Sequence, residues 1–184
     1  MGTLEHTQDN VADLHWLATV LTGRRETADD VIFQALSSVE EAFPLGMNAL
    51  SRRIFIAQAL APVRKDLAAS ARRTVWRRTE KASMPPRSWT LDGETTRSEL
   101  ERALLPIDVF PRAAVLLLLF ERVPLSETAI LLDAKPDLVR TALAVGALEL
   151  TVNLARLQGW QPVAIGSRTN QSYRPNRPAL NGAL

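Results

Sequence analysis

Apolar residues recur at intervals of three and four positions along most of this chain. This spacing places them on one side of an α-helix, and no segment shows the two-residue alternation of a half-buried strand. Glycine and proline interrupt the pattern repeatedly, so the chain is divided into several short helices. The sequence therefore predicts an all-α fold.

The first half of the chain contains four predicted helices. Polar residues fill positions 1–9, so we expect a frayed start before the first apolar stripe. Capping residues and helix breakers mark each boundary. Pro62 either kinks the third helix or begins the fourth. The expected boundaries are Asp9 or Asn10 to Gly23, Thr27 to Pro44, Met47 or Asn48 to Pro62, and Val63 to Lys81.

The second half predicts four more helices, over residues 97–105, 108–120, 126–132 and 136–158. Asp108 is a suitable N-cap, and Pro136 suits the first position of the last helix. A tight turn at residues 133–135 joins a short helix to this long one. A short helix, a tight turn and a longer helix, in this order, are typical of a helix-turn-helix module.

Residues 82–96 interrupt the helical pattern with two adjacent prolines, a glycine and no periodicity, which is typical of a linker. We therefore predict two small helical domains, over residues 1–81 and 97–160. Residues 161–184 are rich in Asn, Pro, Ser, Arg and Gly and are expected to form a flexible tail. This tail fits either a solubilising end, which we favour, or a non-specific phosphate-binding arm.

Composition narrows the possible functions. The 184 residues include no cysteine and two histidines, so disulfides and cysteine-based zinc sites are excluded and a cytoplasmic location is expected. The first ten residues lack the pattern of a signal peptide, and the longest apolar run is too short to span a membrane. No catalytic constellation or metal site is apparent, and His15 beside Trp16 fits packing better than catalysis. We expect a binding protein without a cofactor.

Charge is unevenly distributed although the net charge is only +2. Between Arg64 and Lys81 seven basic residues stand against two acidic ones. Cations of this kind contact nucleic-acid phosphates, and Trp76 among them could stack on an unpaired base. The alternative is a solvated helix face, with Trp76 packed in the core or between domains. The candidate contacts here are Arg64, Lys65, Arg72, Arg73, Trp76, Arg77 and Arg78.

The last predicted helix is the expected DNA-reading element, yet it carries little positive charge. From Pro136 to Leu150 one arginine stands against two acidic residues. Either this helix is more buried than is usual for such a helix, or the fold is retained for protein binding. The candidate base or phosphate contacts in its first two turns are Lys135, Arg140 and Thr141.

The stretch LATVLTGRRETADDVIFQAL contains Leu21–Thr22–Gly23 followed by Ala28–Asp29–Asp30. These motifs resemble the second conserved region of the extracytoplasmic-function type sigma factors, and a later stretch, in matching order, resembles another region of that family. The basic run at residues 64–78 occupies the place of the family's promoter-melting helix. The resemblance implies that the helix of Asp29 and Asp30 docks on core RNA polymerase, whereas helix-dipole compensation explains the same two residues without a partner.

The fourth conserved region of the family is matched by Leu105–Pro106, Arg112, Glu127–Thr128–Ala129 and Leu138–Val139–Arg140. The usual glycine of the turn is replaced by Asp133, and the string of arginines in the last helix is absent. The resemblance implies a transcription initiation protein with three partners: core RNA polymerase, promoter DNA and an anti-sigma protein. The alternatives are a degenerate sigma-fold interaction module that has lost promoter recognition and, less favoured, a one-component regulator.

Overall fold

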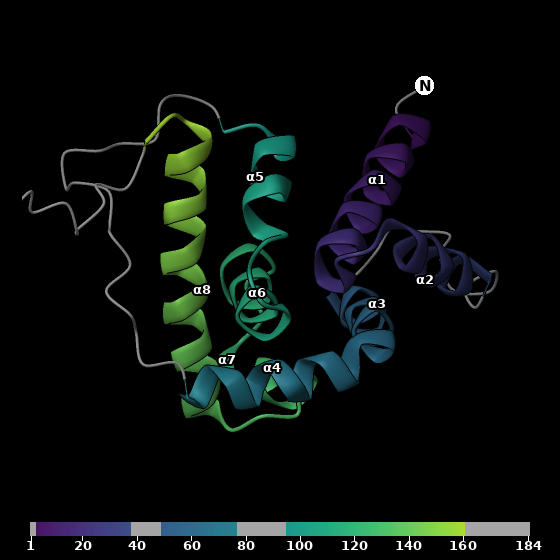
Figure 1. Cartoon of the computed structure of the whole chain (residues 1–184). Helices are drawn as coiled ribbons and strands as arrows, with labels where there is room; N and C mark the ends of the chain where they lie inside the picture. Colours follow the sequence, from purple (N-terminus) through teal and green to yellow (C-terminus); the bar gives the residue numbers. More distant parts are fainter. Residues whose placement is uncertain (1–2, 38–48, 77–94, 161–184) are drawn as a thin grey trace, which may run out of the picture.

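Helices account for the regular structure of residues 3–37, 49–76 and 95–160, the part of the chain that this computed structural model describes (Figure 1). The all-α prediction is confirmed for these residues, which contain no strand. The elements are α1 (Thr3–Thr22), α2 (Arg25–Ser37), α3 (Ala49–Leu60), the 3₁₀ turn η1 (Ala61–Val63), α4 (Arg64–Trp76), α5 (Arg97–Leu104), α6 (Val109–Val115), the π-helical turn η2 (Leu116–Phe120), α7 (Leu125–Leu131) and α8 (Pro136–Leu157).

Several boundaries lie where capping and helix-breaking residues predict them. Gly23 follows α1 with a φ of 75°, a conformation that glycine adopts without strain. Asp108 caps α6 by accepting the amide N–H of Val109 at 3.0 Å. Pro136 occupies the first turn of α8. Pro62 lies in η1 between α3 and α4, so it separates two helices rather than kinking one.

Two predicted helix starts are wrong. The first helix begins at Thr3 rather than at Asp9 or Asn10, because residues 3–9 contain no glycine or proline and a nucleated helix gains one hydrogen bond for each added residue. Thr27 is not an N-cap, since it lies inside α2. The chain reverses at Gly23, and the hydroxyl of Thr22 accepts the amide N–H of Arg24 at 3.3 Å, which allows the helix to restart at Arg25.

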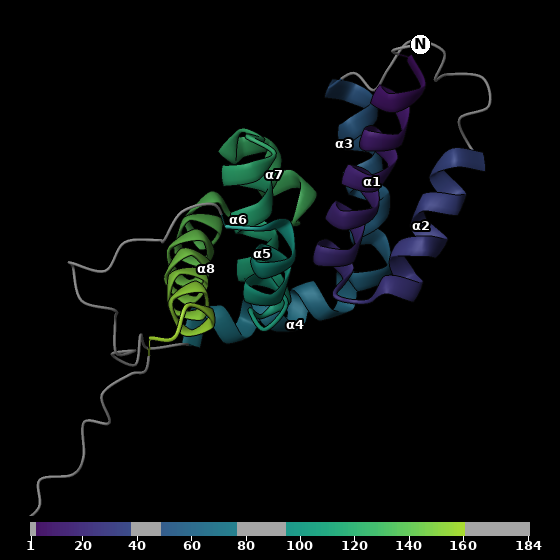
Figure 2. The same cartoon turned by 90° about the horizontal axis from the view of Figure 1, so that it is seen from above.

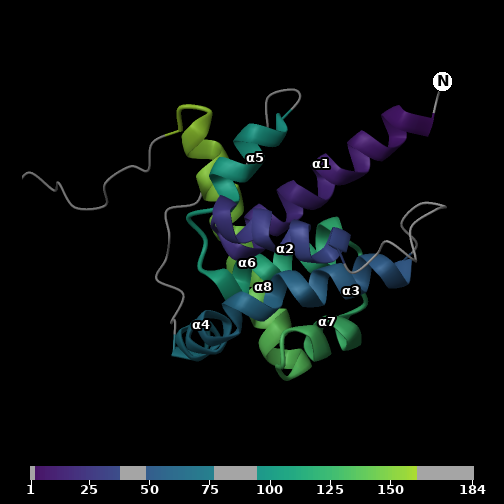
Figure 3. The ribbon, with the colours of Figure 1, turned by 90° about the vertical axis from the view of Figure 1, so that its right-hand side faces the viewer.

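The helices form two groups, α1–α3 and α4–α8, and η1 connects them along the chain. The first three helices, α1–α3, contact one another. On the other side α8 contacts α5, α6 and α7, and α4 packs on α6 and α8 rather than on α1–α3 (Figures 1 and 2). Viewed from the side of α1–α3, this first group covers α6 and part of α8 (Figure 3). The basic helix α4 therefore packs on helices that follow residue 95 in the chain.

Buried apolar residues from both halves of the chain belong to one continuous cluster. Leu17 and Leu21 of α1, Leu60 of α3, and Phe110 and Leu116 beyond residue 95 are all fully buried members. Most of the predicted linker and the whole predicted tail lie outside the described residues. The division into domains at residues 82–96 stays a prediction, and the described residues share a single core.

Close packing explains the apolar character of α8. A Cβ on Gly146 would lie 2.6 Å from the carbonyl oxygen of Pro111 and 2.7 Å from Val115 Cγ2, so α6 and α8 approach closely here. Val139, Ala142 and Val145 are also buried. Among the described helices, α8 alone is long and apolar enough to cross a membrane. Its burial against its neighbours accounts for that composition equally well.

Candidate nucleic-acid interface

The helix α4 has one buried face and one basic face. Its buried side carries Leu67, Ser70 and Thr74, and the Thr74 hydroxyl donates to the carbonyl oxygen of Ser70 at 2.9 Å. Arg64, Lys65 and Arg72 are exposed on the opposite side. Residues seven or eight positions apart share a helix face, so Arg72 lies near both of the others.

The three cations Arg64, Lys65 and Arg72 have no ion pair among the described residues, and we call them the α4 basic face. Such exposed, unpaired cations can exchange their counterions for nucleic-acid phosphates at little structural cost. The α4 basic face is therefore the strongest candidate for phosphate contact in the described part of the chain.

Arg73 differs from these three cations because a carboxylate already holds it. Its Nε donates to Asp108 Oδ2 at 2.9 Å and its Nη2 donates to Asp108 Oδ1 at 2.8 Å. This hydrogen-bonded pair raises the pKa of Arg73 above its ordinary value. Burial alone would raise the pKa of Asp108, but hydrogen bonds from Arg73, Ser70 and the Val109 amide outweigh it and lower that pKa.

Ser70 strengthens the same junction between α4 and α6. Its hydroxyl oxygen accepts the amide N–H of Phe110 at 3.1 Å, and the side chain is fully buried. The first turn of α6 is thus capped by Asp108 from its own chain segment and by Ser70 from α4. Arg73 is consequently part of a packed junction, and the prediction that it contacts DNA requires this pair to break.

Three predicted contacts fall at the edge of the described residues. Trp76 is the last described residue of α4, and its side chain lies outside the description. Arg77 and Arg78 lie outside the described residues. The predicted continuation of the basic face past residue 76 therefore stays a prediction.

The start of α8 carries the other predicted contacts. Lys135, Arg140 and Thr141 are all exposed. Arg140 Nη1 donates to Asp137 Oδ1 at 2.5 Å, and the Thr141 hydroxyl donates to the Asp137 carbonyl oxygen at 3.0 Å. Lys135 has no ion pair among the described residues. One of the two cations at this end of α8 is thus neutralised within its own helix.

The turn before α8 resembles a glycine-type helix ending in which Asp133 takes the place of glycine. Asp133 has a φ of 49°, and the amide of Ala134 donates to the Ala129 carbonyl at 2.9 Å. Aspartate is one of the few residues that adopt this backbone conformation. Asp133 therefore takes the place that glycine usually has in such a helix ending. The α4 helix contacts α8, and in Figure 1 it crosses near the end where α8 begins.

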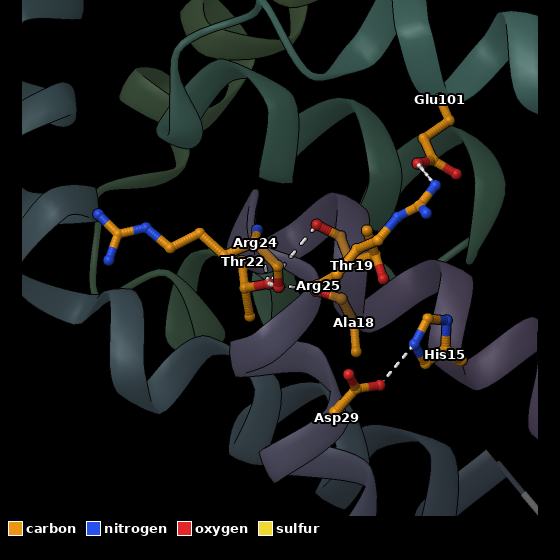
Figure 4. Close-up of polar contacts among 8 residues, drawn as sticks. All are labelled: His15, Ala18, Thr19, Thr22, Arg24, Arg25, Asp29 and Glu101. Carbon is orange, nitrogen blue, oxygen red and sulfur yellow. Dashed lines mark hydrogen bonds and ion pairs between the residues drawn. The ribbon is translucent and has the colours of Figure 1, made fainter.

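The acidic pair predicted to bind RNA polymerase lies on α2. Asp29 and Asp30 are both exposed, and Asp29 Oδ1 lies 2.8 Å from His15 Nε2 on α1 (Figure 4). Asp29 therefore links α2 to α1, whereas Asp30 is exposed and has no ion pair among the described residues. His15 is partly exposed in this pair rather than packed in the core.

Sequence reasoning missed a set of arginine–carboxylate pairs between the two helix groups. The pairs are Arg25–Glu101, Arg52–Glu121, Arg53–Glu127 and Arg97–Asp13. The adjacent arginines within the otherwise apolar α3 were a usable signal. Their partners are far away in the sequence and could not be identified from spacing.

A buried arginine also joins the two groups. Arg112 on α6 donates from Nη1 to the carbonyl oxygens of Leu105 and Ile107 at 2.8 and 2.9 Å. Burial lowers its pKa. A Cβ on Gly23 would lie 2.9 Å from its Nη2, so the guanidinium lies at the C-terminal end of α1, where the helix dipole favours a cation. Arg112 and Gly23, both matched in the family resemblance, thus meet in space.

The described residues contain no group of His, Asp and Glu side chains suited to bind a metal ion. Comparison with known protein families, with curated proteins and with solved structures finds no match to this chain.

Proposed function

We propose that this protein is a sigma-factor-like transcription initiation protein that contacts promoter DNA through the α4 basic face. The observation that carries this proposal is the exposure of Arg64, Lys65 and Arg72 on one side of a helix whose other side is buried. Neutralising several phosphates with such a face supplies most of the affinity of a nucleic-acid-binding surface.

The remaining parts of the proposal follow the family resemblance. The α7–turn–α8 unit would act as a helix-turn-helix with Lys135, Arg140 and Thr141 toward DNA. Asp29 and Asp30 on α2 would contribute to binding core RNA polymerase, and an anti-sigma protein would hold the chain inactive. Asp30 is the better placed of the two acids, since Asp29 is engaged by His15.

A second candidate function is a sigma-fold interaction module that no longer recognises promoters. Two observations on α8 favour it: Asp137 forms an ion pair with Arg140, and the middle of the helix is buried. This leaves Lys135 as the unpaired cation at the start of α8 among the described residues. Such a helix is poorly suited to read a major groove, because recognition there depends on free side chains in its first turns.

A salt titration of promoter-fragment binding, with and without core RNA polymerase, separates the two functions. We expect affinity to fall steeply with salt, and the Arg64→Ala/Arg72→Ala variant to reduce the log–log slope by about two, one for each lost phosphate contact. Arg156→Ala, at the far end of α8, is the control and should leave the slope unchanged. No measurable DNA binding in either condition would reject the first function and favour the second.

A further inference from the structure

The two helix groups share a buried apolar core, in which α1 and α6 make the main direct packing contact between α1–α3 and α4–α8. The rings of Trp16 and Phe120 also meet edge to face across the groups, with their centres 6.5 Å apart. Four arginine–carboxylate pairs add ionic connections, from α2 to α5, from α3 to the residue after η2 and to α7, and from α1 to α5. Ionic contacts are weakened by salt far more than apolar packing is.

The strongest of these pairs is the one between Arg52 and Glu121. Arg52 donates to both carboxylate oxygens of Glu121, from Nη2 to Oε1 at 2.8 Å and from Nε to Oε2. The Glu121 side chain is only 7% exposed, whereas that of Arg52 is 37% exposed. The π-helical turn η2 positions Glu121, because the Glu121 amide donates to the Leu116 carbonyl at 2.9 Å. A two-pronged, partly buried pair of this kind is stronger than an ordinary surface pair.

Three further arginine–carboxylate pairs join the same two helix groups. Arg53 Nε lies 3.0 Å from Glu127 Oε2, and Arg25 Nη2 lies 3.3 Å from Glu101 Oε1 (Figure 4). Arg97 bonds the Asp13 carboxylate at 2.8 Å and the Ala12 carbonyl oxygen at 3.1 Å. Its guanidinium also lies 5.2 Å from the centre of the Trp16 ring, a cation–π contact.

The backbone connection between the groups is short. The chain passes from α3 to α4 only through η1, a single 3₁₀ turn containing Pro62. Because α4 packs on α6 and α8, it belongs to the second group, and η1 is the backbone connection between α1–α3 and that group. Short turns between packed elements are where hinge motions are absorbed.

We propose that these four pairs form an ionic clasp that opens about η1 when a nucleic-acid polyanion competes for its arginines. Opening removes the carboxylate partners of Arg25, Arg52 and Arg53 on the first group, and phosphates take the places of Glu101, Glu121 and Glu127 respectively. A polyanion that binds the open form more tightly shifts the equilibrium toward it. The polyanion step rests on the proposed function, whereas the clasp itself does not.

Energy transfer between two dyes tests the clasp in the full chain. The chain has no cysteine, so Phe33→Cys on α2 and Ala144→Cys on α8, both exposed, give a labelled pair across the two groups. We expect the transfer efficiency to fall as NaCl rises from about 0.05 M to about 0.5 M, because the Debye screening length then shortens to a few ångströms. The Glu121→Gln/Glu127→Gln variant should show the low-transfer state already at low salt.

The matched control removes the same charge elsewhere. Glu26→Gln/Asp133→Asn neutralises two exposed carboxylates that have no ion pair among the described residues, and it should keep the high transfer of the parent. Helical circular dichroism of each variant separates opening from unfolding. Transfer that responds neither to salt nor to the Glu121→Gln/Glu127→Gln variant overturns the clasp.

A duplex DNA probe tests the polyanion step separately. Adding it should lower the transfer efficiency, and by reciprocity Glu121→Gln/Glu127→Gln should bind it about fivefold more tightly than the charge-matched control. If the clasp opens with salt but the probe neither binds nor lowers transfer, the polyanion step fails with the proposed function and the clasp stands. If the probe binds equally to both variants, binding is not coupled to opening and the polyanion step alone is overturned.

Discussion

The helices α4 and α8 are the two elements expected to meet DNA, and they differ in what their charges do. On α4 the exposed cations Arg64, Lys65 and Arg72 have no ion pair among the described residues, whereas Arg73 pairs with Asp108 at the start of α6. On α8 Arg140 is bound by Asp137, and the middle of the helix is packed on α6. Counting charges along a helix is therefore insufficient, since pairing decides which cations can serve a partner.

The largest expected effect concerns the buried middle of α8. Gly146→Val should destabilise the protein by about 1–3 kcal/mol, because the new side chain meets the Pro111 carbonyl and Val115. Ala144→Val, at an exposed position of the same helix, should cost less than about 0.7 kcal/mol of helix propensity. Urea unfolding of both variants measures the difference. Equal stability of the two variants would mean that α8 is not closely packed on α6. The contrast between a packed α8 and an exposed α4 basic face would then be wrong.

The comparison predicts unequal losses of nucleic-acid affinity. Lys65→Ala/Arg72→Ala on α4 removes two unpaired cations, whereas Lys135→Ala/Arg140→Ala on α8 removes one unpaired cation and one paired cation. We expect the salt-dependence slope to drop by about two for the first variant and by about one for the second. Asp137→Asn should increase affinity by releasing Arg140. A greater loss from the α8 variant than from the α4 variant would reverse the roles assigned to the two helices.

A smaller effect is expected where α4 is fixed to α6. Asparagine is as good an N-cap as aspartate, so Asp108→Asn removes the charge of the pair with Arg73 but keeps the cap. We expect a loss of about 0.2–1 kcal/mol at pH 7. The lowered pKa of Asp108 means that its stabilisation is present above the unfolded pKa of about 3.9 and is lost as pH falls through the folded pKa.

Urea unfolding as a function of pH checks this sign. The wild-type protein and Asp108→Asn should differ at neutral pH and converge once the wild-type carboxyl is protonated. A difference that stays constant down to pH 2 would show that the Arg73 pair does not contribute.

The smallest expected effect is stabilising and concerns the turn that precedes α8. Asp133 adopts a left-handed φ of 49°, which costs a non-glycine residue about 1 kcal/mol. Asp133→Gly should therefore raise the free energy of unfolding by up to about 1 kcal/mol, and thermal unfolding measures it. A loss of stability instead would indicate that the Asp133 carboxylate makes a contact of its own, which would change the interpretation of this end of α8.

Much of the local structure could be predicted because helix ends depend on neighbouring residues. Gly23, Asp108 and Pro136 set helix ends through contacts with residues a few positions away, so their roles can be predicted from the sequence. The start of α1 and the position of Thr27 were wrong because an N-cap competes with simple helix extension. The basic character of α4 was also predictable, but the sequence did not separate Arg64, Lys65 and Arg72 from Arg73, which pairs with Asp108.

The sequence by itself therefore determined an all-helical chain, most of its boundaries and one basic helix. The tertiary structure decided which cations are free and how the helices are grouped. Arg73 meets Asp108 across 35 positions, and Arg52 meets Glu121 across 69, so neither pair leaves a periodic trace. Likewise only packing placed α4 on α6 and α8, because its apolar stripe fits any apolar surface. Local hydrogen bonds act between near neighbours in the chain, whereas charges pair with whatever folding brings close.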